Sequence, residues 1–170
     1  MNQVIIMQGL SGSGKTHWAN TNFPNASVCS ADKFFEKGSD GYRFEPSLLG
    51  KAHAQCLGHF IYAINRGDST VIVDNTNTER WEWENYVQLA IHWGYQWGVV
   101  DIYDSPAGLT DEQLAARCKH NVSAEAIARQ RERYEHPMKE ELYLGVKEGM
   151  ADYNMALINL VDAMNNSIGR

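Results

Sequence analysis

Short apolar runs along the chain alternate with longer stretches in which apolar residues recur at helical spacing. The apolar runs predict strands at residues 3–8, Ser27–Cys29, Thr70–Asp74 and Gln96–Tyr103. Strands separated by helices are typical of βαβ units, which build a parallel sheet. Residues 71–73 and 99–100 are continuously apolar, as expected of central strands that helices cover on both faces. The pattern therefore predicts an α/β fold.

The helical patterns fall into three groups. Residues 46–65, entered through Glu45-Pro46-Ser47, and residues 79–93, ended by Gly94, predict crossover helices. The charged segments 111–119 and 124–135 predict two helices of a mobile lid spanning approximately 111–135, joined through His120-Asn121-Val122-Ser123. The tail predicts a last helix packed on the sheet, because it carries apolar residues at helical spacing: Tyr153, Leu157, Leu160, Val161 and Met164.

Length and composition narrow the class of protein. A chain of 170 residues has the length of one compact domain, so we expect a single domain over 1–170. With 15 Lys+Arg against 21 Asp+Glu the net charge is -6, which argues against a protein that coats long stretches of nucleic acid but leaves open a short nucleic-acid end or a small molecule. No apolar run is long enough to span a bilayer, and the three cysteines form no C-x-x-C pair. We therefore expect a cytoplasmic protein with no membrane partner, whose cysteines are packing residues.

The segment Gly9-Leu10-Ser11-Gly12-Ser13-Gly14-Lys15-Thr16 matches the phosphate-binding loop G-x-x-x-x-G-K-[ST], or P-loop. It follows an apolar strand and opens a predicted helix at Lys15, which is the context that the motif requires. Gly12, Ser13 and Gly14 would let backbone N–H groups surround phosphate oxygens. Lys15 would bridge the β- and γ-phosphates of ATP, and the Thr16 hydroxyl would bind Mg²⁺.

Two aspartates follow predicted strands and should lie at the carboxyl edge of the sheet, where open α/β sheets bind ligands. Asp32 could accept the proton of an attacking hydroxyl or could cap a helix that begins at Lys33, and the spacing leaves both roles open. Asp74 is the predicted carboxylate for Mg²⁺ or its water. Asn75 and Asn77 follow it and could line the acceptor site, although they are also common turn and cap residues.

The predicted lid contributes cations. Arg117 and Lys119 are the candidates to close over the transferring phosphoryl group and neutralise its charge. Arg129 can pair with Glu125 at i,i+4, which favours a solvated helix face for it. No histidine pattern predicts a metal site besides Mg²⁺.

In this order, the motifs resemble the polynucleotide 5'-kinase group of P-loop kinases, which includes the kinase half of bacteriophage polynucleotide kinase and the kinase-like domain of the Nedd-four-binding-protein family. The resemblance covers nearly the whole chain. It rests on GLSGSGKT at 9–16, SADKFF at 30–35, DGYRFEP at 40–46, VIVDNTN at 71–77 and LAARCKHNVSAEAIARQRERYE at 114–135.

This resemblance implies a P-loop NTPase fold with four or five parallel strands, ATP as donor and a nucleic-acid 5'-hydroxyl as acceptor. It also implies that Asp32 is the general base and that Arg117 lies near the donor phosphates. The chain departs from the group at two places. Lys119, His120 and Asn121 stand where the phage enzyme has a second lid arginine, so that function either belongs to Lys119 or is missing. Phe34 and Phe35 occupy the region of the phage enzyme's acceptor-side arginine, for which Arg43 is a candidate substitute.

Three functions remain open at this point. The first is transfer of the γ-phosphate from ATP to a 5'-hydroxyl of DNA or RNA. The second is the same chemistry on a small molecule, a nucleoside or a hydroxymethyl group of a modified base, which the acidic net charge and the absent acceptor-side arginine favour. The third is a nucleotide-binding switch that acts through a partner, although a switch needs no base such as Asp32.

Overall fold

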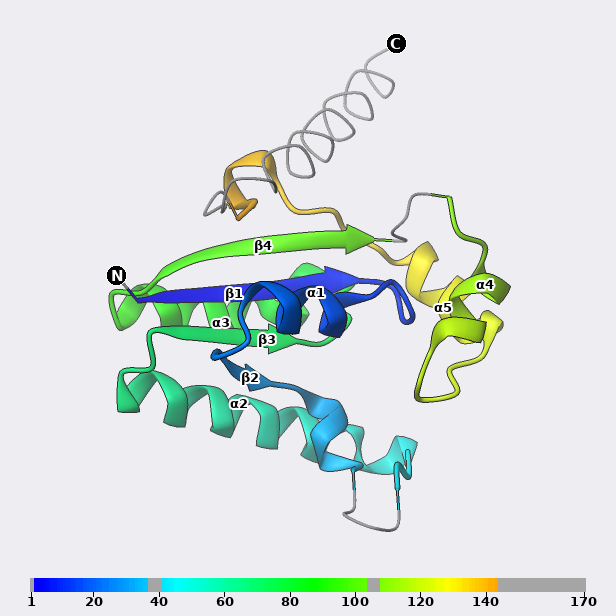
Figure 1. The fold of residues 1–170 in the computed structure, drawn as a ribbon, viewed down its shortest axis with the longest axis horizontal. Helices are drawn as coiled ribbons and strands as arrows, with labels where there is room; N and C mark the ends of the chain where they lie inside the picture. The colour runs from blue at the N-terminus through cyan, green and yellow to red at the C-terminus, as the bar shows by residue number, and fades with distance from the viewer. Residues whose placement is uncertain (1, 37–40, 104–107, 144–170) are drawn as a thin grey trace.

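Four parallel strands form the single sheet of the computed structural model, which describes residues 2–36, 41–103 and 108–143 (Figure 1). The strand order is β2-β3-β1-β4, with β1 at Gln3–Gly9, β2 at Ser27–Cys29, β3 at Thr70–Asp74 and β4 at Gln96–Tyr103. All four strands predicted from the apolar runs are confirmed, and β1 is one residue longer than expected. Together with the flanking helices, this sheet gives the predicted P-loop NTPase fold.

Side chains that alternate along the strands supply two cores, one on each face of the sheet. Val4 and Ile6 point to the face covered by α2 (Leu49–Arg66) and α3 (Arg80–His92). Ile5 and Met7 point to the opposite face, which α1 (Lys15–Asn22) covers. Figure 1 shows α1 in front of the sheet and α3 behind it. The continuously apolar strands are thus explained, because both of their faces are buried.

The crossover helices begin and end at residues suited to these positions. Pro46 opens a short 3-10 helix, Pro46–Leu48, that leads into α2, and Gly67 ends α2 with φ 81° in the left-handed region. At α3, Glu79 and Glu82 form a capping box. Among the described residues, no helix combines the length and the apolar character needed to cross a membrane.

One strand does not lie where the sequence pattern suggested. β3 is central, as predicted, but β4 is at the edge of the described sheet. Its open side is partly covered by a later segment, because the Tyr143 N–H donates to the Val99 carbonyl at 2.8 Å. A Cβ built on Gly98 would stand 2.7 Å from the Tyr143 Cα, so this segment approaches β4 closely. The prediction of a central position was wrong, since an apolar run reports buried faces and not neighbouring strands.

Two short helices, α4 (Asp111–Arg117) and α5 (Ala124–Glu132), lie in the segment predicted as the lid, which is called the lid below. Each ends before its predicted limit. After α4 the chain becomes extended at Cys118, and after α5 it returns to the sheet, where the Tyr134 hydroxyl and the His136 ring contact the buried Asp101 carboxylate at 2.5 and 2.8 Å. The predicted tail helix lies outside the described residues.

The three cysteines are free thiols. Cys29 and Cys56 belong to the core between the sheet and α2, which confirms their prediction as packing residues. Burial raises the pKa of the Cys29 thiol to about 12, so it stays protonated and unreactive. Cys118 is partly exposed in the turn that follows α4.

Candidate active site

The P-loop connects β1 to α1 and folds into the conformation that its glycines allow. Gly12 and Gly14 have φ values of 80° and 101°, in the region that favours glycine. Gly14 is also the N-cap of α1 and provides no capping side chain, so the first N–H groups of the helix are not satisfied by a cap. The positive end of α1 and its N–H groups are therefore directed at the space that the loop encloses.

Lys15 lies buried inside this loop, with 8% of its surface exposed. Its Nζ donates to the carbonyl oxygens of Gly9 and Leu10 at 2.9 and 2.8 Å. Burial lowers the pKa of Lys15, and the nearby carboxylates of Asp74 and Asp32 oppose that shift. The side chain is thus a fixed cation at the loop, close to both aspartates.

Ser13 adds a further group to the P-loop that could bind a phosphate oxygen. The Ser13 hydroxyl oxygen is buried and has no hydrogen-bond partner in the part of the chain that the structure describes. A buried hydroxyl is normally satisfied, so a ligand oxygen bound in the loop would complete it. With Lys15 and the first N–H groups of α1, this donor set suits the phosphates of ATP.

Thr16 and Asp74 meet beside the loop, as the sequence predicted for a Mg²⁺ pair. The Thr16 hydroxyl donates to Asp74 Oδ2 at 2.7 Å. Asp74 is 6% exposed, and burial raises the pKa of its carboxyl, with Thr16 and Lys15 acting in the opposite direction. A hydroxyl and a carboxylate are ligands that Mg²⁺ prefers, so these two residues would hold the ion.

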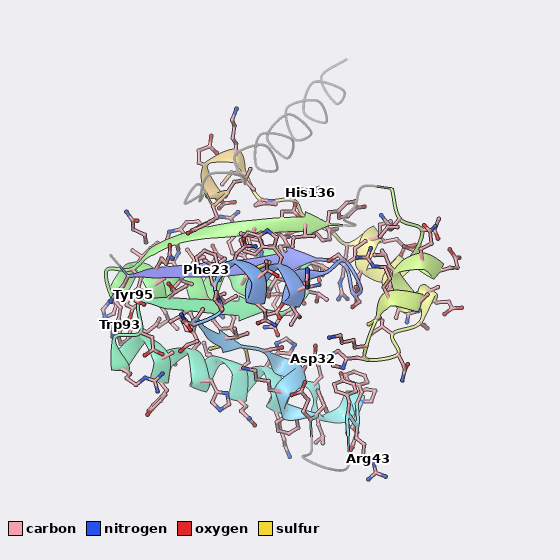
Figure 2. The ribbon with its side chains drawn as sticks, viewed as in Figure 1. Phe23, Asp32, Arg43, Trp93, Tyr95 and His136 are labelled. Atoms are coloured by element: carbon pink, nitrogen blue, oxygen red, sulfur yellow. The ribbon has the colours of Figure 1, made fainter. Side chains whose placement is uncertain are left out.

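Asp32 follows β2 and reaches the same edge of the sheet (Figure 2). It does not cap a helix. The N-cap of the short 3-10 helix Ala31–Phe34 is Ser30, whose hydroxyl oxygen accepts from the Asp32 N–H at 3.3 Å. The Asp32 side chain is therefore available for other contacts, and 48% of its surface is exposed.

Tyr42 and His120 both contact the Asp32 carboxylate, and the sequence analysis assigned a role to neither. The Tyr42 hydroxyl donates to Oδ1 at 2.9 Å, and His120 Nε2 lies 3.7 Å from Oδ2. The two rings also stack, with centroids 4.0 Å apart and planes inclined by 32°. Tyr42 lies 10 positions from Asp32 in the chain and His120 lies in the lid, so no local pattern could have joined them.

Asn75 and Asn77 both use their amides to hold backbone segments. Asn75 Oδ1 accepts from the Ala31 N–H at 2.9 Å, which fixes the segment that carries Asp32. Asn77 is 2% exposed, and its Nδ2 donates to the Met7 carbonyl at 2.7 Å. The two residues thus tie β2, β1 and the end of β3 together at the site.

The lid packs directly on the P-loop. Leu10 forms a small core with Leu114 of α4 and Ile127 of α5. Gln130 of α5 pairs with Ser11, accepting from its N–H at 3.0 Å and donating to its hydroxyl at 3.1 Å. A Cβ built on Gly12 would lie only 2.2 Å from the Leu114 carbonyl oxygen, so this glycine lets α4 approach.

The predicted cations are distributed unequally around the site. Arg117, at the end of α4, places a guanidinium nitrogen 3.9 Å from where a Cβ on Gly14 would stand, which is the donor side. Lys119 follows with an exposed side chain. Arg43 is exposed and extends away from Asp32 (Figure 2), so the structure does not bring it to the predicted acceptor side.

Comparison with known proteins identifies the family. A match to the AAA domain family extends over residues 4–137, which includes the P-loop, both aspartates and the lid. The chain belongs to the AAA domain family. Human NEDD4-binding protein 2 (Homo sapiens) is 32% identical to this AAA domain over 135 residues, which are 78% of the chain but 8% of that protein. The chain therefore spans only a small part of the length of this relative.

Solved structures agree with the fold of this AAA domain. A gluconokinase from Sinorhizobium meliloti 1021 is similar with a TM-score of 0.52 and 18% identity, over 98% of this chain and 95% of that one. A fungal RNA kinase is similar with a TM-score of 0.51 and 13% identity, over 99% of this chain and 46% of that one. An APS kinase from Mycobacterium tuberculosis in complex with AMPPNP and APS has a TM-score of 0.50 and 16% identity, over 95% and 98% of the two chains. The AAA domain therefore has a kinase-like P-loop fold.

Proposed function

We propose that this AAA domain transfers the γ-phosphate of ATP to a hydroxyl group, and that the acceptor is the 5'-hydroxyl end of DNA or RNA. The observation that carries the proposal is the position of Asp32. Its half-exposed carboxylate lies at the same edge of the sheet as the P-loop, near enough to Lys15 to oppose the effect of burial on the pKa of that lysine. A kinase needs such a carboxylate, whereas a nucleotide switch does not.

Each residue then has a part in the transfer. Asp32 accepts the proton of the acceptor hydroxyl, while Lys15 and Arg117 stabilise the negative charge on the transferring phosphoryl group. Thr16 and Asp74 hold Mg²⁺, which when bound neutralises charge on the β- and γ-phosphates. Gly12, Ser13 and Gly14 orient the phosphate chain, and Lys119 is the second cation that the lid would contribute to the donor side.

The choice of a nucleic-acid end rests on relatives. NEDD4-binding protein 2 shares 32% identity with the chain, and the structural neighbours include an RNA kinase. The motifs from DNTN at 74–77 to the lid also resemble polynucleotide 5'-kinases. A protein that acts at one end of a strand needs few phosphate contacts, so a net charge of -6 is compatible with this acceptor.

A small-molecule hydroxyl is the second candidate acceptor. The observation that favours it is the outward direction of Arg43, because it leaves the acceptor side of Asp32 without that arginine to bind a nucleic-acid phosphate (Figure 2). The neighbours that match along their whole length, a gluconokinase and an APS kinase, are also named for small substrates.

One assay separates these possibilities. The chain is incubated with γ-labelled ATP and, in parallel, a 5'-hydroxyl oligonucleotide, the same oligonucleotide already 5'-phosphorylated, and a panel of nucleosides and sugar acids. Label on the 5'-hydroxyl oligonucleotide alone is the expected result. Label on a nucleoside or sugar acid alone would replace the acceptor, and bound nucleotide with no labelled product would replace the kinase by a switch.

A further inference from the structure

A histidine of the lid reaches the acceptor side of the site. His120 stands in the turn between α4 and α5, and its Nε2 lies 3.7 Å from Asp32 Oδ2. The next residue, Asn121, has a φ of 53°, a left-handed conformation that asparagine adopts more readily than most residues. This tight turn directs the imidazole from the lid toward the end of β2.

Tyr42 approaches the same carboxylate from the segment that follows the 3-10 helix Ala31–Phe34. Its hydroxyl donates to Asp32 Oδ1 at 2.9 Å. Its backbone is held by an antiparallel bridge between Glu36 and Tyr42 and by the Arg43 N–H, which donates to the Phe35 carbonyl at 3.0 Å. The two carboxylate oxygens of Asp32 therefore face different neighbours, one from the segment after the 3-10 helix and one from the lid.

The contact between the two neighbours is made by their ring faces. The Tyr42 and His120 centroids are 4.0 Å apart with an interplanar angle of 32°. By contrast, 3.7 Å from Nε2 to Oδ2 is too long for a hydrogen bond. The other ring nitrogen, Nδ1, is buried with no hydrogen-bond partner among the described residues, so no second contact fixes the tautomer. The stacked face, and not a fixed proton, is what His120 contributes here.

We propose that Tyr42 and His120 are positioning residues that orient the Asp32 carboxylate when the lid covers the site. The hydroxyl of Tyr42 holds Oδ1, so Oδ2 is the oxygen that receives the proton of the acceptor hydroxyl. As that proton moves to Oδ2, the acceptor oxygen bonds to the γ-phosphorus and the bond from this phosphorus to the β,γ-bridging oxygen breaks, leaving ADP. The stack of His120 on Tyr42 keeps the hydroxyl of Tyr42 in place and makes the orientation of the base depend on lid closure.

This inference rests on the proposed function and adds to it the lid residue that acts on the acceptor side. Arg117 lies on the donor side, next to Gly14, and the Lys119 side chain is exposed. Of the three lid residues at 119–121, His120 is therefore the one that the geometry assigns to the base. No phosphate contact is required of it, since its partner is an aromatic ring.

Three variants test the proposal, with kcat and the KM for ATP measured on the acceptor that the wild-type chain labels. Tyr42→Phe keeps the ring and removes the hydroxyl. His120→Ala removes the stack, and His120→Phe restores it without ring nitrogens. We expect Tyr42→Phe and His120→Ala to lower kcat by about tenfold or more, as for loss of a hydrogen bond to a charged group, with the KM for ATP within about twofold of wild type. His120→Phe should recover most of the lost kcat.

His92→Ala is the matched control, because this histidine also contacts an aromatic neighbour, Trp93, edge to face with ring centroids 4.7 Å apart. Trp93 lies at the end of the molecule away from Asp32 (Figure 2). His92→Ala should leave kcat and KM unchanged. If the wild-type chain transfers phosphate and the kcat values of Tyr42→Phe and His120→Ala stay within twofold of the wild-type value, the inference is overturned and the proposed function stands. A higher KM for ATP in these two variants, at unchanged kcat, would overturn the inference in the same way. Failure of His120→Phe to recover kcat would also overturn it. Absence of wild-type transfer to every acceptor would overturn the proposed function and this inference together.

Discussion

The two aspartates at the P-loop have unlike surroundings. Asp74 is 6% exposed and accepts a hydrogen bond from Thr16, whereas the Asp32 side chain is 48% exposed and faces Tyr42 and His120. A buried carboxylate beside a hydroxyl suits a cation, and a more exposed one suits an incoming hydroxyl. Their surroundings therefore support different roles for two side chains of the same type.

Substitution of Asp32 and of Lys15 should separate transfer from nucleotide binding. Asp32→Asn should abolish phosphoryl transfer and leave ATP affinity nearly unchanged, because the carboxylate does not lie in the P-loop. Lys15→Ala should impair both, because it removes the fixed cation and the hydrogen bonds that its Nζ donates to the Gly9 and Leu10 carbonyls. Calorimetric titration with Mg·ATP and the labelled-ATP assay measure the two quantities. Glu84→Gln, at an exposed position of α3, is the control, and transfer by Asp32→Asn at the wild-type rate would remove Asp32 from the mechanism.

The burial of Asp74 predicts a pH dependence of stability. Because its pKa is raised in the folded state, the folded chain binds a proton more readily than the unfolded chain, for which the reference pKa is 3.8. The resulting stability is fully present below that value and is lost as pH rises through the higher folded pKa. We therefore expect the Tm of the ligand-free wild type, relative to Asp74→Asn, to rise as pH falls from 7 toward 4. The amide can still accept from Thr16, so a Tm difference that does not change with pH would contradict this account.

At the scale of elements, the lid and the P-loop are in direct contact through Gly12. Its φ of 80° and its closeness to the Leu114 carbonyl each argue for glycine. The two hydrogen bonds between Gln130 and Ser11 extend the contact between lid and P-loop to α5. The position of Arg117 over the donor side consequently depends on how α4 packs on the loop.

Gly12→Ala tests this contact, and Gly67→Ala is a matched control. Gly67 has a similar φ of 81°, but a Cβ there would meet nothing within 4 Å. Both variants should lose about 1–2 kcal/mol of stability from the left-handed backbone. Only Gly12→Ala should lose more than this and also weaken ATP binding, because its Cβ displaces α4. Urea unfolding and calorimetry measure the two effects, and equal losses in both variants would show that α4 does not press on the loop.

At the scale of the whole molecule, the lid shares its core with the nucleotide-binding end of the sheet. Leu10, Leu114 and Ile127 are each 0% exposed, so neither the loop nor the lid has a complete core without the other. After α5 the chain crosses back to β4, where the Tyr134 hydroxyl and the His136 ring contact the Asp101 carboxylate. We therefore expect the lid and the sheet to unfold as one domain.

Leu114→Ala should consequently destabilise the entire chain. Removing a fully buried leucine lowers the free energy of unfolding by about 2–5 kcal/mol. Unfolding followed by tryptophan fluorescence and by circular dichroism should still give one coincident transition at a lower urea midpoint. Ile91→Ala, at a position that is 54% exposed, should change the midpoint little. A separate early transition in the wild type would mean that the lid is an independent unit.

The sequence by itself determined the strands, the crossover helices and the P-loop with its lysine. Alternation and continuity of apolar residues record which side chains are buried, and the loop conformation depends on adjacent glycines such as Gly12 and Gly14. These are local properties, so the bounds of β2, β3 and β4 could be predicted to the residue.

The tertiary structure alone decided which distant side chains meet. Nothing near Asp32 in the sequence indicates that Asn75 fixes the chain before it or that His120 stacks on Tyr42. The edge position of β4 was equally hidden, because burial of a strand does not specify its neighbours. Such contacts depend on where the whole fold carries each loop, and a pattern along one segment holds no record of the segments that will face it.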